Sequence, residues 1–279
     1  MSAPPDLSVI VVAYNSADLL CATLASVEQY THDITYEIIV VDNASQDARV
    51  GELAGQFAQA RLVRNARNLG FAAANNRGLR LSAGRYVALL NPDTLLHDDA
   101  LSALVRWLDA HPAIGAVGPQ LLRPDGMPQP YSYGDAPTPR YLLRRRLSAL
   151  IGGDLHQWQG VQPRRADWVA GTCIVLRRAA IEAAGLLDER FFLYFEDVDW
   201  GMRLTRADWP VMFTPAVAIT HIGGGSVGAA SSPHYDRSLV QLYRKHYGAA
   251  AALIVWIALR LYRALRQAGR RLRGGRASG

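Results

Sequence analysis

Cysteine is scarce in this sequence of 279 residues, which contains only Cys21 and Cys173. The two are far apart, show no metal-ligand spacing and fall in apolar patterns, so we interpret them as small buried residues in a reducing compartment. The N-terminal apolar run has no basic segment before it and no small-residue cleavage site after it. It predicts a first strand instead of a signal peptide, and we expect a cytoplasmic protein.

Common nucleotide-binding motifs are also missing. No GxGxxG follows the first apolar run and no GxxxxGK[ST] occurs anywhere, which disfavours dinucleotide-binding and P-loop folds. We find no internal repeat. The apolar run at residues 248–259 has twelve residues, which is short of the ~18 that suggest a membrane-spanning helix.

Positive charge is concentrated at the C-terminal end. The net charge is +6, and residues 260–279 contain seven arginines and no acidic residue, so the rest of the chain is close to neutral. This distribution, without an aromatic stacking platform, disfavours a nucleic-acid partner. Leu261, Leu265, Ala268 and Leu272 recur at helical spacing opposite the arginines. The pattern predicts an amphipathic helix on an anionic membrane surface, and the alternative is a helix packed on the domain with a solvated basic end.

Short apolar, β-branched runs alternate with helix-like segments in the first part of the chain. Most residues of these runs are apolar, as in a sheet covered on both faces. Strands are expected at residues 7–14, 36–42, 60–65, 84–91 and 113–122. The alternation predicts an α/β fold with a mostly parallel sheet.

Polar residues follow the ends of these strands, namely Asn15, Asp42, Asn68 and Asp93. In open α/β sheets this edge binds ligands. The Asp42 carboxylate could accept the imide N–H of a pyrimidine base or cap the next helix. Asp93 could hold a divalent cation that also binds phosphate oxygens, or it could be only a turn residue.

Two later segments bear on the same edge. His221 precedes Gly223–Gly225, and such glycines permit close approach of the backbone to a phosphate. A purely structural histidine is the alternative. Residues 123–146 are rich in proline, glycine and tyrosine, so we expect a long, mobile loop over the site.

The stretch LYFEDVDW places Glu196, Asp197 and Asp199 among aromatic and aliphatic residues. Burying a charge is costly unless it is paired or bound to a metal. A carboxylate in apolar surroundings has a raised pKa and is a better general base. For Asp199 we expect a structural role, as a helix cap or as the partner of Arg203.

Seven motifs occur in one order along the chain: VIVVAYNS, IIVVDNAS, NARNLGFAAANN, ALLNPD, WVAGTCIVLRR, FFLYFEDVDW and HIGGGSV. Together they resemble family 2 glycosyltransferases of the GT-A fold, in the bacterial rhamnosyltransferase-like branch, over residues 7–227. The resemblance implies one nucleotide-diphospho-sugar transferase domain at 1–230, with a mostly parallel central sheet flanked by helices. A helical, basic, membrane-associating tail would follow at 231–279.

The resemblance also implies roles for particular residues. The nucleotide sugar would be bound by Ala13, Tyr14, Asn15, Asp42, Arg67, Asn68, Gly70 and Asn91. Asp93 and His221 would bind Mg²⁺ or Mn²⁺, with Asn91 standing where many relatives have a first aspartate. Asp197 would be the base and Glu196 its neighbour, although the reverse stays open. Contacts with the acceptor would come from Trp168, Gly171 and Arg203, with a core position as the alternative for Trp168.

The activity implied is metal-dependent transfer of a sugar with inversion. The expected donor is dTDP-L-rhamnose, and the expected acceptor is a cell-surface glycan or a polyprenyl-diphosphate-linked glycan at the inner face of the plasma membrane. A UDP-linked hexose or galactofuranose donor is the alternative within this class. A non-catalytic module that binds a sugar nucleotide or a glycan is the alternative outside it.

Overall fold

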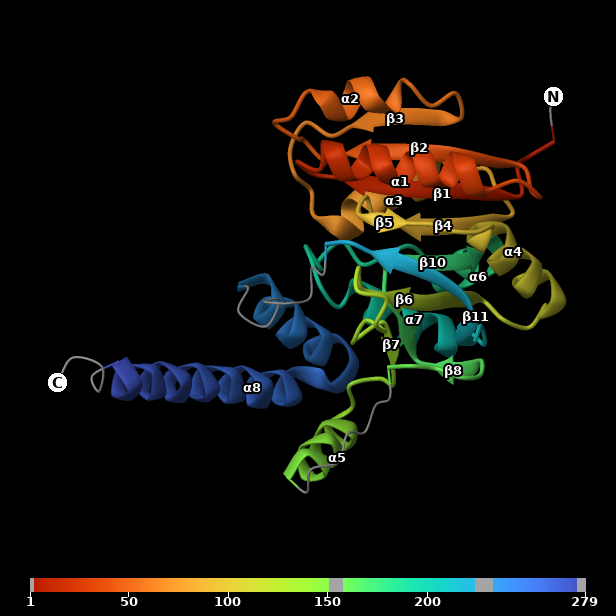
Figure 1. Ribbon diagram of the computed structural model, residues 1–279. Coiled ribbons are helices and arrows are strands. Elements are labelled where there is room, and N and C mark those ends of the chain that lie inside the picture. Colours follow the sequence, from red (N-terminus) through yellow and green to blue (C-terminus); the bar gives the residue numbers. More distant parts are fainter. Residues whose placement is uncertain (1–2, 151–157, 224–232, 275–279) are drawn as a thin grey trace.

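A mixed β-sheet with helices on both faces organises the chain (Figure 1). The computed structural model describes residues 3–150, 158–223 and 233–274. Within these residues the main sheet has nine strands in the order β3-β2-β1-β4-β10-β6-β11-β5, with β8 paired to β11. The strands are β1 (Leu7–Ala13), β2 (Tyr36–Asp42), β3 (Ala60–Arg64), β4 (Tyr86–Leu90), β5 (Thr94–Leu95), β6 (Ala116–Leu122), β8 (Arg164–Ala166), β10 (Cys173–Arg177) and β11 (Val211–His221). A separate pair is formed by β7 (Tyr133–Gly134) and β9 (Trp168–Val169).

The first four strands along the chain run parallel, as the alternation of strands and helices predicted. β1 lies between β2 and β4, and β2 continues to β3, all in parallel register. β10 is antiparallel to both β4 and β6, while β11 runs parallel to β6. The carboxyl ends of β1, β2, β4, β6 and β11 therefore meet at one edge of the sheet.

Two apolar cores cover the two faces of the sheet. The helices are α1 (Ala17–Tyr30), α2 (Arg49–Ala54), α3 (Phe71–Leu81), α4 (Ala100–Ala110), α5 (Pro139–Leu150), α6 (Arg178–Ala184), α7 (Glu196–Arg206) and α8 (Pro233–Gly274). Val9 and Val11 of β1 face one core with α1, α2 and α4, whereas Ile10 and Val12 face the other with α3, α6 and α7. Both sets are buried, which explains why the strand is apolar at every position except Ser8.

One expectation about a connecting segment is corrected. Residues 123–146 are not one long loop, because they contain β7 and the start of α5. Residues 211–221 form the single strand β11, with an irregularity in its pairing with β6 between Thr214 and Ala218. Gly224 and Gly225 of the glycine run lie outside the described residues.

Helix α8 consists of two arms that meet at Gly248, whose φ of 88° is not helical. We call residues 233–247 the first arm and residues 249–274 the second arm. The first arm packs on the α/β body: Leu242 and Tyr243 are buried, and the Ser238 hydroxyl donates a hydrogen bond of 2.8 Å to the Leu193 carbonyl. The packed body therefore extends past the boundary expected at residue 230. The second arm projects away from the sheet (Figure 1).

Candidate active site

A cavity of about 460 Å³ opens at the carboxyl edge of the sheet. Nine of the residues expected in the site line it: Tyr14, Asn68, Gly70, Asn91, Asp93, Gly171, Glu196, Asp197 and His221. They come from strand ends, from the loop before α3, from the segment before β10 and from the first turn of α7. The edge predicted from the pattern of strands thus carries the cavity.

Glu196 and Asp197 occupy the first turn of α7. Tyr194 and Phe195, which lead into this helix, have left-handed backbones with φ of 71° and 68°. Asp197 is held by two backbone donors, since its Oδ2 accepts from the Gly171 N–H at 3.0 Å and its Oδ1 from the Val198 N–H at 2.8 Å. Gly171, expected to touch the acceptor, is therefore a direct support of the Asp197 carboxylate.

The two carboxyl groups differ in their surroundings. Glu196 is 5% exposed, and its Oε2 lacks a hydrogen-bond partner among the described residues. Burial and the neighbouring Asp197 raise the pKa of Glu196 well above its ordinary value. Burial also raises the pKa of Asp197, while the hydrogen bonds from Gly171 and Val198 act against that rise. The Asp197 carboxylate thus accepts two backbone hydrogen bonds, whereas Glu196 Oε2 accepts none among the described residues.

Asp93 and His221 meet across the cavity floor. Pairing of β5 with β11 sets Thr94 opposite His221, which brings Asp93 Oδ1 to 3.1 Å from His221 Nε2. His221 is 3% exposed, and its Nδ1 lies 2.8 Å from Gln129 Oε1. Gly223 lies so close to the Asp93 carboxylate that a Cβ at this position would collide with it. Glycine is needed here to admit the carboxylate.

The hydrogen bond to Gln129 defines what His221 offers to the cavity. Gln129 Oε1 is an acceptor, so Nδ1 of a neutral His221 carries the hydrogen and Nε2 presents its lone pair toward Asp93. Neither His221 Nε2 nor Asp93 Oδ1 has a hydrogen-bond partner in the described part of the chain. Two buried lone pairs facing each other are costly unless a proton or a cation lies between them.

These two atoms suit a hard divalent cation. The described residues contain no group of three or more His, Cys, Asp or Glu side chains that could hold a metal. A cation at Asp93 and His221 would thus have two protein ligands and would need further oxygens from water or a diphosphate. Mg²⁺ keeps several waters and usually binds through one or two carboxylates plus substrate phosphates. Asp93 fits such an ion as its carboxylate ligand, and His221 Nε2 would add an imidazole nitrogen beside it.

Asn43 organises the opposite wall of the cavity, and the sequence analysis did not single it out. It is 4% exposed; its Nδ2 donates to Asn68 Oδ1 at 2.9 Å, and its Oδ1 accepts from the Leu69 N–H at 3.0 Å. Gly70 follows with φ of 83°, and a Cβ there would collide with the Phe192 carbonyl. The Phe71 N–H donates to that carbonyl at 2.7 Å, which joins this loop to the segment before α7. Asn43 directly follows Asp42 in the motif VVDNAS, and this position in the sequence could have identified it as a residue of the site.

Three residues expected on the nucleotide lie beside the cavity without lining it. Ala13 is fully buried at the end of β1. The Asn15 side chain accepts a hydrogen bond from the Gln46 N–H at 2.8 Å. Asp42 is 4% exposed and accepts from the Ser45 N–H at 2.8 Å in the turn after β2. The helix cap considered as its alternative is not formed, because α2 begins at Arg49 without a side-chain cap hydrogen bond. Arg67 is exposed and also does not line the cavity.

Two of the expected acceptor contacts are corrected by the structure. Trp168 packs against the apolar cluster of Phe191, Val198 and Met202, and its Nε1 donates to the Asp135 carbonyl at 3.1 Å. It is a core residue here. Arg203 does not line the cavity, because its Nε donates to Asp199 Oδ2 at 2.9 Å. This ion pair is the structural partnership considered for Asp199.

Comparison with solved structures places the fold. GalNAc-T7 with UDP, GalNAc and Mn²⁺ superposes with a TM-score of 0.63 at 18% identity, over 88% of this chain and 48% of that one. The mannosyltransferase PcManGT of Pyrobaculum calidifontis, in complex with GDP-Man and Mn²⁺, gives 0.60 at 21% identity, over 100% of this chain and 77% of that one. The fold is GT-A, as the resemblance implied.

Sequence comparison leads to the family. An N-acetylglucosaminyl-diphospho-decaprenol L-rhamnosyltransferase of Mycobacterium tuberculosis is 28% identical over 297 aligned positions, which cover 96% of this chain and 95% of that protein. The O-antigen biosynthesis protein RfbC of Myxococcus xanthus is also 28% identical, over 83% of this chain but 18% of its own length. The family profile described as Glycosyl transferase family 2 matches residues 8–181. The chain belongs to glycosyl transferase family 2.

Proposed function

We propose that the chain transfers L-rhamnose from dTDP-L-rhamnose, with inversion, to a glycan acceptor carried on a polyprenyl diphosphate. One observation carries the catalytic part: the buried Glu196–Asp197 pair and the Asp93–His221 pair line the same cavity. The mycobacterial relative, similar over almost the full length of both chains, supports the choice of sugar and of a lipid-linked acceptor.

In this proposal each pair has one task. Asp197 takes the proton of the acceptor hydroxyl as that oxygen attacks the anomeric carbon, and Glu196 orients the acceptor or tunes the pKa of Asp197. The bond from the anomeric carbon to the diphosphate oxygen breaks on the opposite side. Asp93 and His221 would hold a divalent cation, which would supply charge stabilisation for the leaving diphosphate. Tyr14, Asn68 and Gly70 border the space for the nucleotide.

The tail is proposed to hold the enzyme at the inner face of the membrane. By length and composition Pro233–Ala264 is one helix that could cross a bilayer, and only 6% of its most apolar window is buried. The break at Gly248 divides this stretch, and the first arm packs on the body. We therefore place the second arm in the membrane surface. A helix in that position needs one apolar face, so it agrees with the exposed apolar residues and does not require an unbroken helix across the bilayer.

A donor screen tests the function. Purified full-length protein with Mg²⁺ or Mn²⁺ would be incubated with dTDP-rhamnose, UDP-glucose, UDP-galactose, UDP-GlcNAc, UDP-galactofuranose or GDP-mannose, with and without a lipid-linked acceptor. Release of nucleoside diphosphate would be followed, with EDTA as control. We expect release from dTDP-rhamnose that EDTA abolishes. If only a UDP sugar is turned over, that sugar and not dTDP-rhamnose is the donor. If calorimetry shows nucleotide binding but no donor is turned over, the non-catalytic alternative is supported.

A further inference from the structure

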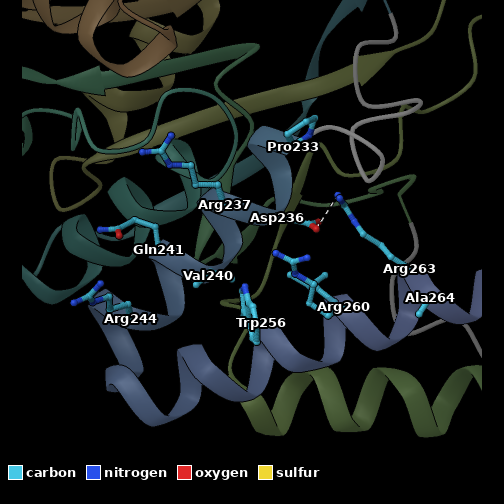
Figure 2. Close-up of a pocket in the computed structure, with 11 residues that line it drawn as sticks. Pro233, Asp236, Arg237, Val240, Gln241, Arg244, Trp256, Arg260, Arg263 and Ala264 are labelled. Carbon is cyan, nitrogen blue, oxygen red and sulfur yellow. Dashed lines mark ion pairs between the residues drawn. The ribbon is translucent and has the colours of Figure 1, made fainter.

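A larger cavity, of about 810 Å³, lies between the two arms of α8 (Figure 2). The first arm contributes Arg237 and Arg244 to its wall, and the second arm contributes Trp256, Arg260 and Arg263. Trp256 and Arg260 point from the second arm toward the first. We call this cavity the arm groove. It is separate from the catalytic cavity, with which it shares no lining residue.

The arm groove carries an excess of positive charge. Four arginines line it against the single acid Asp236, which pairs with Arg263 at 2.7 Å. Arg260 lies over the Trp256 ring, with 5.1 Å from its guanidinium carbon to the ring centroid. In the described part of the chain, neither Arg237 nor Arg244 has a carboxylate partner. Guanidinium groups in such a position bind phosphate oxygens through paired hydrogen bonds.

The first arm lies between the arm groove and the catalytic cavity. On its other side the first arm contacts the segment before α7. His234 stacks on Phe192 with ring centroids 4.7 Å apart, and the Ser238 hydroxyl donates a hydrogen bond to the Leu193 carbonyl. Phe192 and Leu193 line the catalytic cavity. A ligand in the arm groove is therefore one helix away from the acid pair.

The second arm adds an apolar surface beside the groove. Leu253, Ile254, Ile257 and Leu261 are 57%, 68%, 44% and 60% exposed, respectively. At 100° per residue these four gather on one side of the helix, next to the side that carries Trp256, Arg260 and Arg263. A surface with guanidinium groups and an adjoining apolar stripe suits a ligand that has both a phosphate and a hydrocarbon chain.

We infer that the arm groove binds the diphosphate of the lipid-linked acceptor, with the apolar stripe in the bilayer beside it; this inference rests on the proposed function. Two features favour a diphosphate over the single phosphate of a bulk phospholipid. Arginines of both arms line the groove, two from each arm. It also adjoins the arm that supports the catalytic segment, where an acceptor has to arrive.

Vesicle binding by the full chain tests the inference. Neutral phosphatidylcholine vesicles would carry either undecaprenyl diphosphate or phosphatidylglycerol at equal total charge, and binding would be measured by sedimentation without any donor. We expect tighter binding to the diphosphate vesicles. Arg237→Gln/Arg260→Gln, with one change in each arm, should weaken that binding by roughly tenfold or more.

A matched control removes the same charge elsewhere. Arg140 and Arg144 are exposed on α5, so Arg140→Gln/Arg144→Gln should bind the diphosphate vesicles as the unchanged protein does. Equal binding to both vesicle types, an unaffected groove variant, or an equal loss in the control would each overturn the inference. If the protein binds the diphosphate lipid but turns over no donor, the proposed function fails and the inference about the groove does not. Transfer to a water-soluble acceptor without preference for the diphosphate lipid would overturn the inference alone.

Discussion

The residues from Tyr194 to Asp197 combine backbone strain with buried charge. Tyr194 and Phe195 both have positive φ, which costs an L-residue about 1–2 kcal/mol each. Their rings are held by Tyr235 of α8, with centroids 5.9 and 4.9 Å away. Strain that neighbouring structure maintains is common at catalytic positions. Here it turns the chain so that α7 begins with both acids facing the cavity.

Glu196→Gln should stabilise the protein in a pH-dependent manner. Burial and Asp197 raise the pKa of Glu196 above its unfolded value, so the folded state binds this proton more tightly and loses stability as pH rises toward the raised pKa. Glutamine removes that loss. We expect Tm to rise by a few degrees at about pH 8 and to change little at about pH 4, where the glutamate is protonated in both states. An equal change at both pH values in thermal melts would contradict this cause.

Gln129→Leu should weaken metal binding although Gln129 is not proposed as a ligand. Its Oε1 is the acceptor that fixes the His221 ring with Nε2 toward Asp93. Loss of such a supporting partner typically costs 10- to 100-fold in metal affinity, which titration with Mn²⁺ would measure. Gln129→Glu keeps an acceptor for Nδ1 and should retain most of the affinity. If both variants bind Mn²⁺ equally, Gln129 does not orient His221.

At the scale of elements, a buried ion cluster joins α7 to the first arm of α8. Asp199 is fully buried and contacts Arg203 at 2.9 Å, Lys245 at 2.7 Å and His246 at 2.7 Å. Lys245 also reaches Asp188 at 2.7 Å. The helix that begins with the catalytic pair is thus tied to the arm that supports the segment before it.

Asp199→Ala should lower the free energy of unfolding by about 3–5 kcal/mol, because it removes the carboxylate partner of the largely buried Arg203 and one of the two carboxylates that contact Lys245. Denaturant unfolding would measure the loss. Asp18 is the matched control: it pairs with Arg49 at 2.7 Å but is 82% exposed, so Asp18→Ala should cost less than about 1 kcal/mol. Similar costs for the two variants would mean that the buried cluster contributes no more than a surface pair.

Elements with a strong local pattern were predictable from the sequence. The centres of β1, β2 and β4 are apolar runs. Because these strands are parallel, the polar residues that follow them lie at one edge of the sheet. Gln129 was not predictable, because its contact with His221 joins positions 92 residues apart. The break in α8 had a local signal, since Gly248 follows Arg244, Lys245 and His246, and basic residues before a glycine are typical of a helix end. The apolar run after it obscured that signal.

On the scale of the whole molecule, we propose that the body carries catalysis and that the second arm of α8 holds the protein at the membrane. Removal of residues 249–279 should leave transfer to a water-soluble acceptor within about twofold, because few residues of this arm are buried against the body. Binding to anionic vesicles should be lost. Circular dichroism would check that the shortened chain folds. Retained vesicle binding would place the membrane contact elsewhere.

The role of Asp197 as the base is tested most directly with the variant Asp197→Asn. Its rate of sugar transfer and its affinity for the nucleoside diphosphate would be compared with those of the unchanged protein. The asparagine keeps the shape and can accept one of the two hydrogen bonds from Gly171 and Val198 through its single side-chain oxygen, but it cannot take a proton. We expect the rate of sugar transfer to fall by about 10²–10⁴-fold, while calorimetry gives an almost unchanged affinity for the nucleoside diphosphate with Mn²⁺. Transfer at the unchanged rate would remove Asp197 from the role of base and would contradict the account.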